Sequence, residues 1–123
     1  MNQKILIIED DKAILKAYKD HLERIGYVVD FAENGEDGLK KIEEFKPDLV
    51  LLDIVMPKMD GITMLKNLRA TNTENSNVPV IFLTNLSDDK SIMEAVESGS
   101  MSYLVKADHD LSDVVDRIKS VLG

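Results

Sequence analysis

The stretch Asp48–Gly61, DLVLLDIVMPKMDG, decides the fold of this 123-residue chain. Its apolar run 49–52 is short and lies between helix-breaking residues, which predicts a buried parallel strand that ends at Asp53. Pro57 prevents a strand or helix from continuing, and Asp60 is expected to cap the next helix. Because ligands gather at the carboxyl ends of the strands in open α/β sheets, Asp53 lies where a reacting group is expected.

Outward from this stretch, the same alternation of a short apolar run and a helical pattern extends along the whole chain. Asp30 interrupts the second run, which predicts a strand at an edge of the sheet. Ser87 is expected to cap the fourth helix, and that helix is expected to turn Ile92, Ala95 and Val96 toward the sheet. The predicted strands are Lys4–Ile8, Val28–Ala32, Leu49–Leu52, Val80–Leu83 and Ser102–Val105.

This strict alternation predicts an α/β fold in which helices cover both faces of a parallel sheet. Right-handed crossovers leave few topologies for five such units. The commonest is the flavodoxin-like (βα)5 fold, a doubly wound five-stranded parallel sheet with strand order 2-1-3-4-5. No linker-like segment divides the sequence, so residues 1–123 are predicted to form one domain.

Composition and charge argue against several classes of protein. The chain has no cysteine, which removes disulfides, thiolate metal sites and cysteine nucleophiles and suits a cytoplasmic protein. A net charge of -8 argues against direct binding to nucleic acid or anionic lipid. No apolar run approaches the roughly 20 residues that span a bilayer. We therefore expect neither a nucleic-acid partner nor a membrane segment.

Four of the five predicted strands end in side chains suited to chemistry: the carboxylates Glu9, Asp10 and Asp53, the hydroxyl of Thr84 and the ammonium of Lys106. Each residue taken alone is explained as a helix cap or a solvated strand end, but together they favour a site. Clustered carboxylates repel one another unless a hard cation such as Mg²⁺ or Mn²⁺ lies between them. One carboxylate can then act as a nucleophile toward a phosphoryl group whose oxygens the hydroxyl and the ammonium hold.

With residues 53–61 and Tyr103, this set resembles the receiver domain of bacterial and archaeal two-component response regulators over essentially the whole chain. The resemblance implies that Asp53 accepts a phosphoryl group from a histidine kinase or a phosphotransfer protein. It also implies that Thr84 and Lys106 bind the phosphoryl group, while Tyr103 changes its rotamer as Thr84 moves. The implied Mg²⁺ (or Mn²⁺) ligands are the side chains of Glu9, Asp10 and Asp53 and the backbone carbonyl of Val55.

Two positions depart from the pattern of that family. Ala107 follows Lys106, where the family usually has a proline in a cis peptide. Since a cis bond before a non-proline residue costs about 2.5–4 kcal/mol, either the loop carries that strain or it runs differently. Asn85 follows Thr84, where the family usually has a very small residue, and we expect Asn85 to alter the lifetime of the phosphoryl group.

The resemblance implies a switch rather than an enzyme that turns over another substrate, because its only chemistry is self-phosphorylation and self-dephosphorylation. The face formed by the fourth helix, the fifth strand and the fifth helix is expected to change its affinity for a downstream protein target or a fused output domain. A phosphorylation-linked homodimer through this face is left open.

Three alternative functions fit the sequence less well. A Mg²⁺-dependent phosphatase of the haloacid-dehalogenase type has a second aspartate two residues after its aspartyl nucleophile, where this chain has Val55. A flavodoxin-like cofactor binder needs a phosphate cradle and an aromatic residue to stack a flavin, but the loops lack the cradle and the chain has no tryptophan. A receiver-like scaffold that is never phosphorylated is disfavoured by the complete set of site residues.

Overall fold

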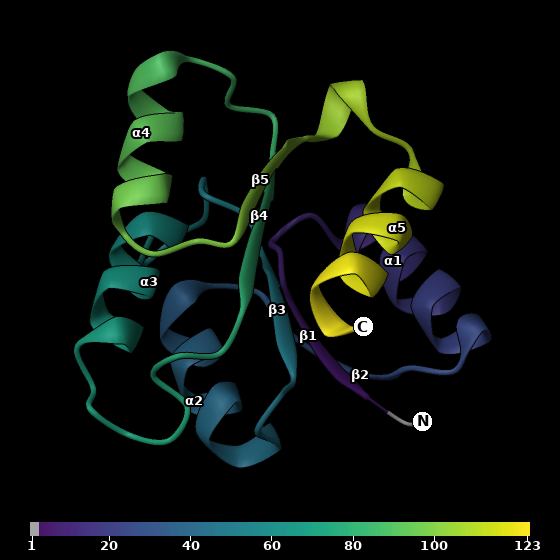
Figure 1. The fold of residues 1–123 in the computed structure, drawn as a ribbon, viewed down its shortest axis with the longest axis horizontal. Helices are drawn as coiled ribbons and strands as arrows, with labels where there is room; N and C mark the ends of the chain where they lie inside the picture. The colour runs from purple at the N-terminus through teal and green to yellow at the C-terminus, as the bar shows by residue number, and fades with distance from the viewer. Residues whose placement is uncertain (1–2) are drawn as a thin grey trace.

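Five parallel strands form the centre of the computed structural model, which describes residues 3–123 (Figure 1). The strands are β1 (Lys4–Ile8), β2 (Val28–Ala32), β3 (Leu49–Leu52), β4 (Val80–Thr84) and β5 (Ser102–Val105). Their order in the sheet is β2-β1-β3-β4-β5, which confirms the predicted flavodoxin-like topology and the edge position of β2. The last residues of β1 and β3 pair in register, so the residues that follow these two strands are neighbours.

Helices cover both faces of the sheet. They are α1 (Lys12–Ile25), α2 (Gly35–Phe45), α3 (Gly61–Arg69), α4 (Asp89–Glu97) and α5 (Leu111–Leu122), and a short 3-10 helix, η1 (Lys106–Asp108), precedes α5. Helices α1 and α5 lie on one face, and α2, α3 and α4 lie on the other (Figure 1). Because alternate strand residues point to opposite faces, the sheet contributes to two separate apolar cores. Among residues 3–123, no helix combines the length and the apolar character that crossing a membrane requires.

Side-chain caps begin the helices, and the predicted cap of α3, Asp60, is confirmed. Asp11 caps α1 and Asn34 caps α2, while an Asp60 carboxylate oxygen accepts a hydrogen bond from the Thr63 N–H at 2.8 Å. The expectation that Ser87 caps α4 was wrong, because α4 begins at Asp89 and Asp88 is its cap. The two oxygens of the Asp88 carboxylate accept hydrogen bonds from both the N–H and the hydroxyl of Ser91, a pairing that one serine hydroxyl cannot match.

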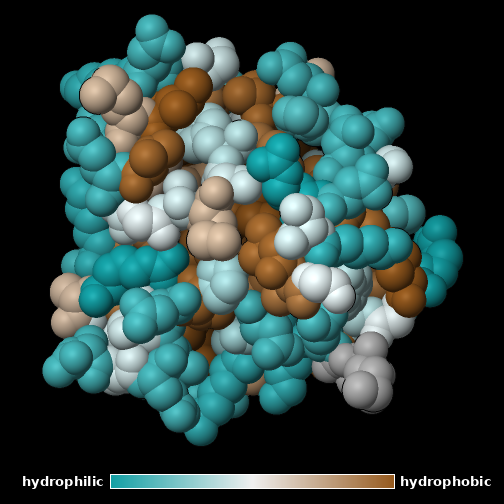
Figure 2. All heavy atoms as spheres, in the orientation of Figure 1, coloured by the Kyte–Doolittle hydropathy of each residue, from teal (hydrophilic) through white to brown (hydrophobic). Residues whose placement is uncertain are grey.

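Helix α4 packs less completely than predicted. Ala95 is buried and Ile92 is half-buried, as expected, but Val96 is 59% exposed, and the expectation that it faces the sheet was wrong. Successive residues of a helix are about 100° apart around its axis, which turns Val96 out of the narrow stripe that contains Ile92 and Ala95. In the space-filling view, hydrophobic residues show among the hydrophilic ones in the region of α4 (Figure 2).

Candidate functional site

Two neighbouring strand ends bring three carboxylates together. The Asp53 N–H donates to the carbonyl oxygen of Ile8 at 3.0 Å, which ties the residue after β3 to the end of β1. One carboxylate oxygen from each of Glu9, Asp10 and Asp53 lies within 4.8 Å of the other two. The acids that the sequence pattern selected therefore form one cluster, with the donor set that Mg²⁺ and Mn²⁺ prefer.

Two of these three acids are buried. The exposed fraction is 3% for Glu9 and 8% for Asp53, whereas Asp10 is exposed. Burial, the largest effect, raises the pKa of Glu9 to about 7, and the Asp53 carboxylate adds to the rise while Lys106 opposes it. Glu9 therefore holds its proton more tightly than a free carboxyl group does. A bound divalent cation would remove the repulsion that favours this protonation.

Lys106 reaches the cluster from the end of β5. Its ammonium donates to Glu9 Oε1 and, at 3.3 Å, to Asp53 Oδ2. Burial lowers the pKa of Lys106, but the two carboxylates outweigh it and leave that pKa above its usual value, so Lys106 is charged. Residues 3–123 contain no cis peptide bond, and Lys106–Asp108 form the 3-10 turn η1. The loop at Ala107 therefore runs differently from the family pattern, and Lys106 still enters the site.

Thr84 and Tyr103 are joined through one residue that the sequence analysis did not select. The Thr84 side chain, 1% exposed, accepts a hydrogen bond from the Leu86 N–H at 3.4 Å. The Tyr103 hydroxyl donates to the Leu86 carbonyl oxygen at 2.7 Å. Both bonds use the backbone of Leu86, and a backbone contact leaves no signal in the residue types. Leu86 thus connects the end of β4 to β5.

The loop after β3 holds Asp53 by its backbone. Asp53 Oδ1 accepts a hydrogen bond from the Ile54 N–H at 2.8 Å, and the Ile54 carbonyl accepts one from the Gly61 N–H at 2.9 Å. A Cβ atom at Gly61 would lie 2.1 Å from the Asp53 carbonyl oxygen, so this position requires glycine. Val55 lies in this loop with its side chain 62% exposed.

Asn85 and Ala107, the two positions that depart from the family pattern, line one cavity beside the site. The cavity has a volume of about 440 Å³, and Lys106 and Tyr18 also line it. Burial is the main cause that raises the pKa of Tyr18. The charge of Lys106 opposes this rise, and the charge of Glu9 adds to it. Tyr18 carries no signal of a site in the sequence, because an aromatic residue at helical spacing is more typical of a core.

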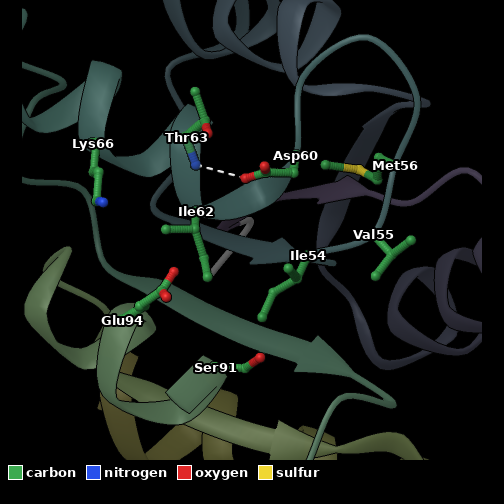
Figure 3. Close-up of a pocket in the computed structure, with 9 residues that line it drawn as sticks. All are labelled: Ile54, Val55, Met56, Asp60, Ile62, Thr63, Lys66, Ser91 and Glu94. Carbon is green, nitrogen blue, oxygen red and sulfur yellow. Dashed lines mark hydrogen bonds between the residues drawn. The ribbon is translucent and has the colours of Figure 1, made fainter.

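A second hollow, of about 360 Å³, lies on the other side of the loop after β3, between α3 and α4 (Figure 3). Val55 and Met56 contribute to it from the loop, Lys66 from α3, and Ser91 and Glu94 from α4. Glu9, Asp10, Asp53, Thr84 and Lys106 are not among its lining residues, so it is separate from the cluster of acids.

Comparison with known proteins identifies the family that shares these features. A family model for the response regulator receiver domain matches residues 5–119. The chain is 37% identical over 122 residues to the alkaline phosphatase synthesis transcriptional regulatory protein PhoP of Bacillus subtilis, covering 99% of this chain and 49% of that protein. It is 41% identical over 102 residues to the transcriptional regulatory protein AfsQ1 of Streptomyces coelicolor, covering 83% and 44%. The chain thus spans about half the length of these curated relatives.

Solved structures agree with this match. A two-component response regulator from Clostridium difficile superposes with a TM-score of 0.89 at 34% identity, covering 98% of this chain and 95% of that one. The receiver domain of the Francisella response regulator 1452 superposes with a TM-score of 0.88 at 33% identity, covering 98% and 96%.

Proposed function

The chain belongs to the response regulator receiver domain family, and from this membership we propose that Asp53 accepts a phosphoryl group from a histidine kinase or a phosphotransfer protein. The observation that carries the proposal is the position of the Asp53 carboxylate, which lies close to the acids after β1 and accepts a hydrogen bond from the Lys106 ammonium after β5. A nucleophile, a cation site and a fixed positive charge meet there, and phosphoryl transfer needs these parts.

The two oxygens of Asp53 have different tasks in this proposal. The Ile54 N–H holds Oδ1 at 2.8 Å, which leaves Oδ2, the oxygen nearest Lys106, to attack phosphorus. The new O–P bond forms as the bond between phosphorus and the donor's histidine nitrogen breaks, and that nitrogen keeps the electron pair. The Lys106 ammonium and the Thr84 hydroxyl bind oxygens of the transferred group, and the ammonium offsets their negative charge.

Glu9, Asp10, Asp53 and the backbone carbonyl of Val55 would hold the metal ion, Mg²⁺ or Mn²⁺. The fit rests on three carboxylate oxygens within 4.8 Å of one another, the hard oxygen donors that these ions prefer. When bound, the ion neutralises part of the charge on the acids and on the phosphoryl oxygens. Lys106 pairs with both Glu9 and Asp53 in the structure, and from this position its ammonium can reach the oxygens of a phosphoryl group on Asp53.

Thr84 and Tyr103 convert this chemistry into a change of shape. As Thr84 turns toward the phosphoryl group, it gives up the hydrogen bond from the Leu86 N–H, and Leu86 moves with the start of α4. Tyr103 then loses or changes its bond to the Leu86 carbonyl. The face of α4, β5 and α5 thereby changes its affinity for a downstream protein target or an output domain, or for a second copy of the chain. We place this switch in the cytoplasm.

The test is the intact mass of the protein after incubation with acetyl phosphate, with and without Mg²⁺, beside the variant Asp53→Asn. We expect a metal-dependent, base-labile phosphoryl adduct on the wild type and none on the variant. A folded wild type that forms no adduct with Mg²⁺ present would leave the scaffold alternative instead. The phosphatase alternative gains no support from the family match.

A further inference from the structure

The hollow of about 360 Å³ between α3 and α4 has a positive charge on one wall and a negative charge on the other. Lys66 extends into it from α3, and Glu94 extends toward Lys66 from α4 (Figure 3). Asp60, the third charged residue of the lining, caps α3 and accepts the Thr63 N–H. Within residues 3–123, neither Lys66 nor Glu94 forms an ion pair. Two opposite charges therefore face each other across a gap.

The two walls of this hollow are held differently. Buried residues fix α3 along its length, whereas Ala95 is the only buried residue of α4. The C-terminal end of α4 is tied to α3, because the Arg69 guanidinium donates to the carbonyl of Gly99, which follows the C-cap of α4. Glu94 lies midway between Gly99 and Asp89, the first residue of α4. A rotation of α4 about its tied end therefore moves Glu94 about half as far as the start of the helix.

The proposed switch moves the start of α4 toward this hollow. Ile54, which directly follows Asp53, lines the hollow, and Leu86 packs against the apolar cluster that contains Ile54. The Leu86 N–H donates to the Thr84 side chain in the structure. As Thr84 turns toward a phosphoryl group on Asp53, the connection from β4 to α4 is drawn in the same direction. The gap between the two charged walls then narrows.

We propose that Lys66 and Glu94 form a latch, an ion pair that closes across the hollow when Asp53 is phosphorylated and stabilises the phosphorylated position of α4. The inference rests on the proposed function, since the phosphoryl group on Asp53 is what moves α4. The lysine stem is flexible, so its ammonium reaches Glu94 while the backbone of α3 stays in place. Because Lys66 is exposed, the pair is worth no more than a surface ion pair, up to about fivefold in the switching equilibrium.

The test reverses each charge and measures the affinity for beryllofluoride, a phosphoryl analogue, from amide chemical shifts at saturating Mg²⁺. Lys66→Glu and Glu94→Lys each replace attraction by repulsion and should weaken beryllofluoride binding by about three- to tenfold. The double variant exchanges the two charges and should return the affinity to within about 1.5-fold of the wild type. Lys40→Glu on α2, outside the hollow, matches the net charge of Lys66→Glu and should bind as the wild type does.

The outcomes of this cycle separate the latch from the chemistry at Asp53. A wild type that does not bind beryllofluoride refutes the proposed function and the latch with it. Wild-type binding that both single reversals leave unchanged, or a loss that the double variant does not restore, overturns the latch alone. Tighter binding by Lys66→Glu would also overturn the latch, because the pair would then stabilise the resting position of α4.

Cross-linking tests whether the hollow closes. The chain has no cysteine, so Lys66→Cys combined with Glu94→Cys provides the only two thiols. We expect a short bismaleimide to link them about twofold faster or more when beryllofluoride and Mg²⁺ are bound than with Mg²⁺ alone. Lys66→Cys combined with Glu97→Cys, at the tied end of α4, is the control and should show a smaller rise. Equal rates for the first pair in both states would show that α4 does not approach Lys66.

Discussion

Helices α3 and α4 lie on the same face of the sheet and have nine residues each, but the protein holds them differently (Figure 1). Five of the nine residues of α3 are buried, whereas only Ala95 is buried in α4. The strands follow the same trend, since all four residues of β3 are buried and only one of four in β5. The half that carries Asp53 is therefore fixed, and the half that would respond to phosphorylation is held by few contacts.

This contrast explains how one chain can serve both as a reaction site and as a switch. A phosphoryl-transfer site requires fixed distances, and buried apolar side chains maintain them. A switch requires a segment whose displacement costs little, and few buried contacts provide it. The N-terminal end of α4 is linked to the site through Leu86. Its C-terminal end is held instead by a side chain of α3.

Arg69, the last residue of the well-buried helix α3, holds one part of the loosely held half in place. Its guanidinium donates to the carbonyls of Ser76 and Val78 at 2.9 and 2.7 Å and to the Gly99 carbonyl at 2.7 Å. Gly99 has a φ of 98° and follows Ser98, the C-cap of α4, so Arg69 ties that end to α3. We therefore expect α4 to move mainly at its N-terminal end.

The largest expected effect is a loss of stability when a buried side chain of α3 is truncated, and the same kind of truncation in α4 provides the comparison. Leu65→Ala in α3 removes a side chain that is 0% exposed and should lower the free energy of unfolding by about 2–5 kcal/mol. Val96→Ala in α4 removes one that is 59% exposed and should change it by less than about 0.5 kcal/mol. Urea unfolding measures both values. Equal losses in the two variants would contradict the contrast between α3 and α4.

The second-largest expected effect comes from removing the Arg69 guanidinium that ties α4 to α3. Arg69→Met keeps most of the apolar stem but loses three hydrogen bonds from a charged group, and we expect a loss of about 1.5–3 kcal/mol in urea unfolding. Hydrogen exchange should rise at residues 99–101 and stay unchanged in β3. Arg69→Lys keeps the charge but lacks the planar guanidinium that donates to three carbonyls, so it should recover only part of the loss. Full recovery with lysine would mean that the charge, rather than the geometry, holds α4.

Glu9 makes the stability of the fixed half depend on pH. Its pKa is about 7 in the folded protein against 4.5 for the free group, so the folded state binds the extra proton between these values. The free energy of unfolding should therefore fall as the pH rises from about 4.5 to about 7, by on the order of 1–3 kcal/mol. Glu9→Gln, which cannot ionise, should remove this part of the pH dependence.

Mg²⁺ should reverse this loss, because it favours the ionised form of Glu9. The gain in stability at saturating Mg²⁺ should be larger at pH 8 than at pH 5.5 in the wild type. Thermal unfolding at the two pH values, with and without Mg²⁺, measures this gain. A stabilisation by Mg²⁺ that is independent of pH would contradict the assignment of Glu9 as a ligand.

The sequence predicted the fixed half better than the loosely held half. Buried strands appear as continuous apolar runs, and Glu9, Asp53 and Lys106 stand out because charged side chains follow those runs directly. The errors, Ser87 as a cap and Val96 as a core residue, both lie around α4, where few contacts constrain the choice. Leu86 and Arg69 were missed because their contacts involve backbone carbonyls and amides distant in sequence, which residue types do not reveal.

The smallest expected effect concerns the link between β4 and β5. Tyr103→Phe removes the hydroxyl that donates to the Leu86 carbonyl and should cost about 0.5–1.5 kcal/mol in urea unfolding. The rate of phosphorylation by acetyl phosphate should stay unchanged, because Tyr103 is not among the residues that bind Asp53. Tyr27→Phe, at the far end of the sheet, is the matched control. A slower phosphorylation of Tyr103→Phe would place Tyr103 in the reaction site rather than in the switch.

The most direct test of the division into a fixed and a responding half is the map of backbone amide chemical shifts when Mg²⁺ and beryllofluoride, a phosphoryl analogue, bind. Relative to Mg²⁺ alone, we predict large changes at Asp53, along residues 84–93 and at Tyr103. We predict small changes at residues 97–99 and in α3 beyond its first turn. Changes confined to the immediate neighbours of Asp53, or equally large along α3 and α4, would contradict the account.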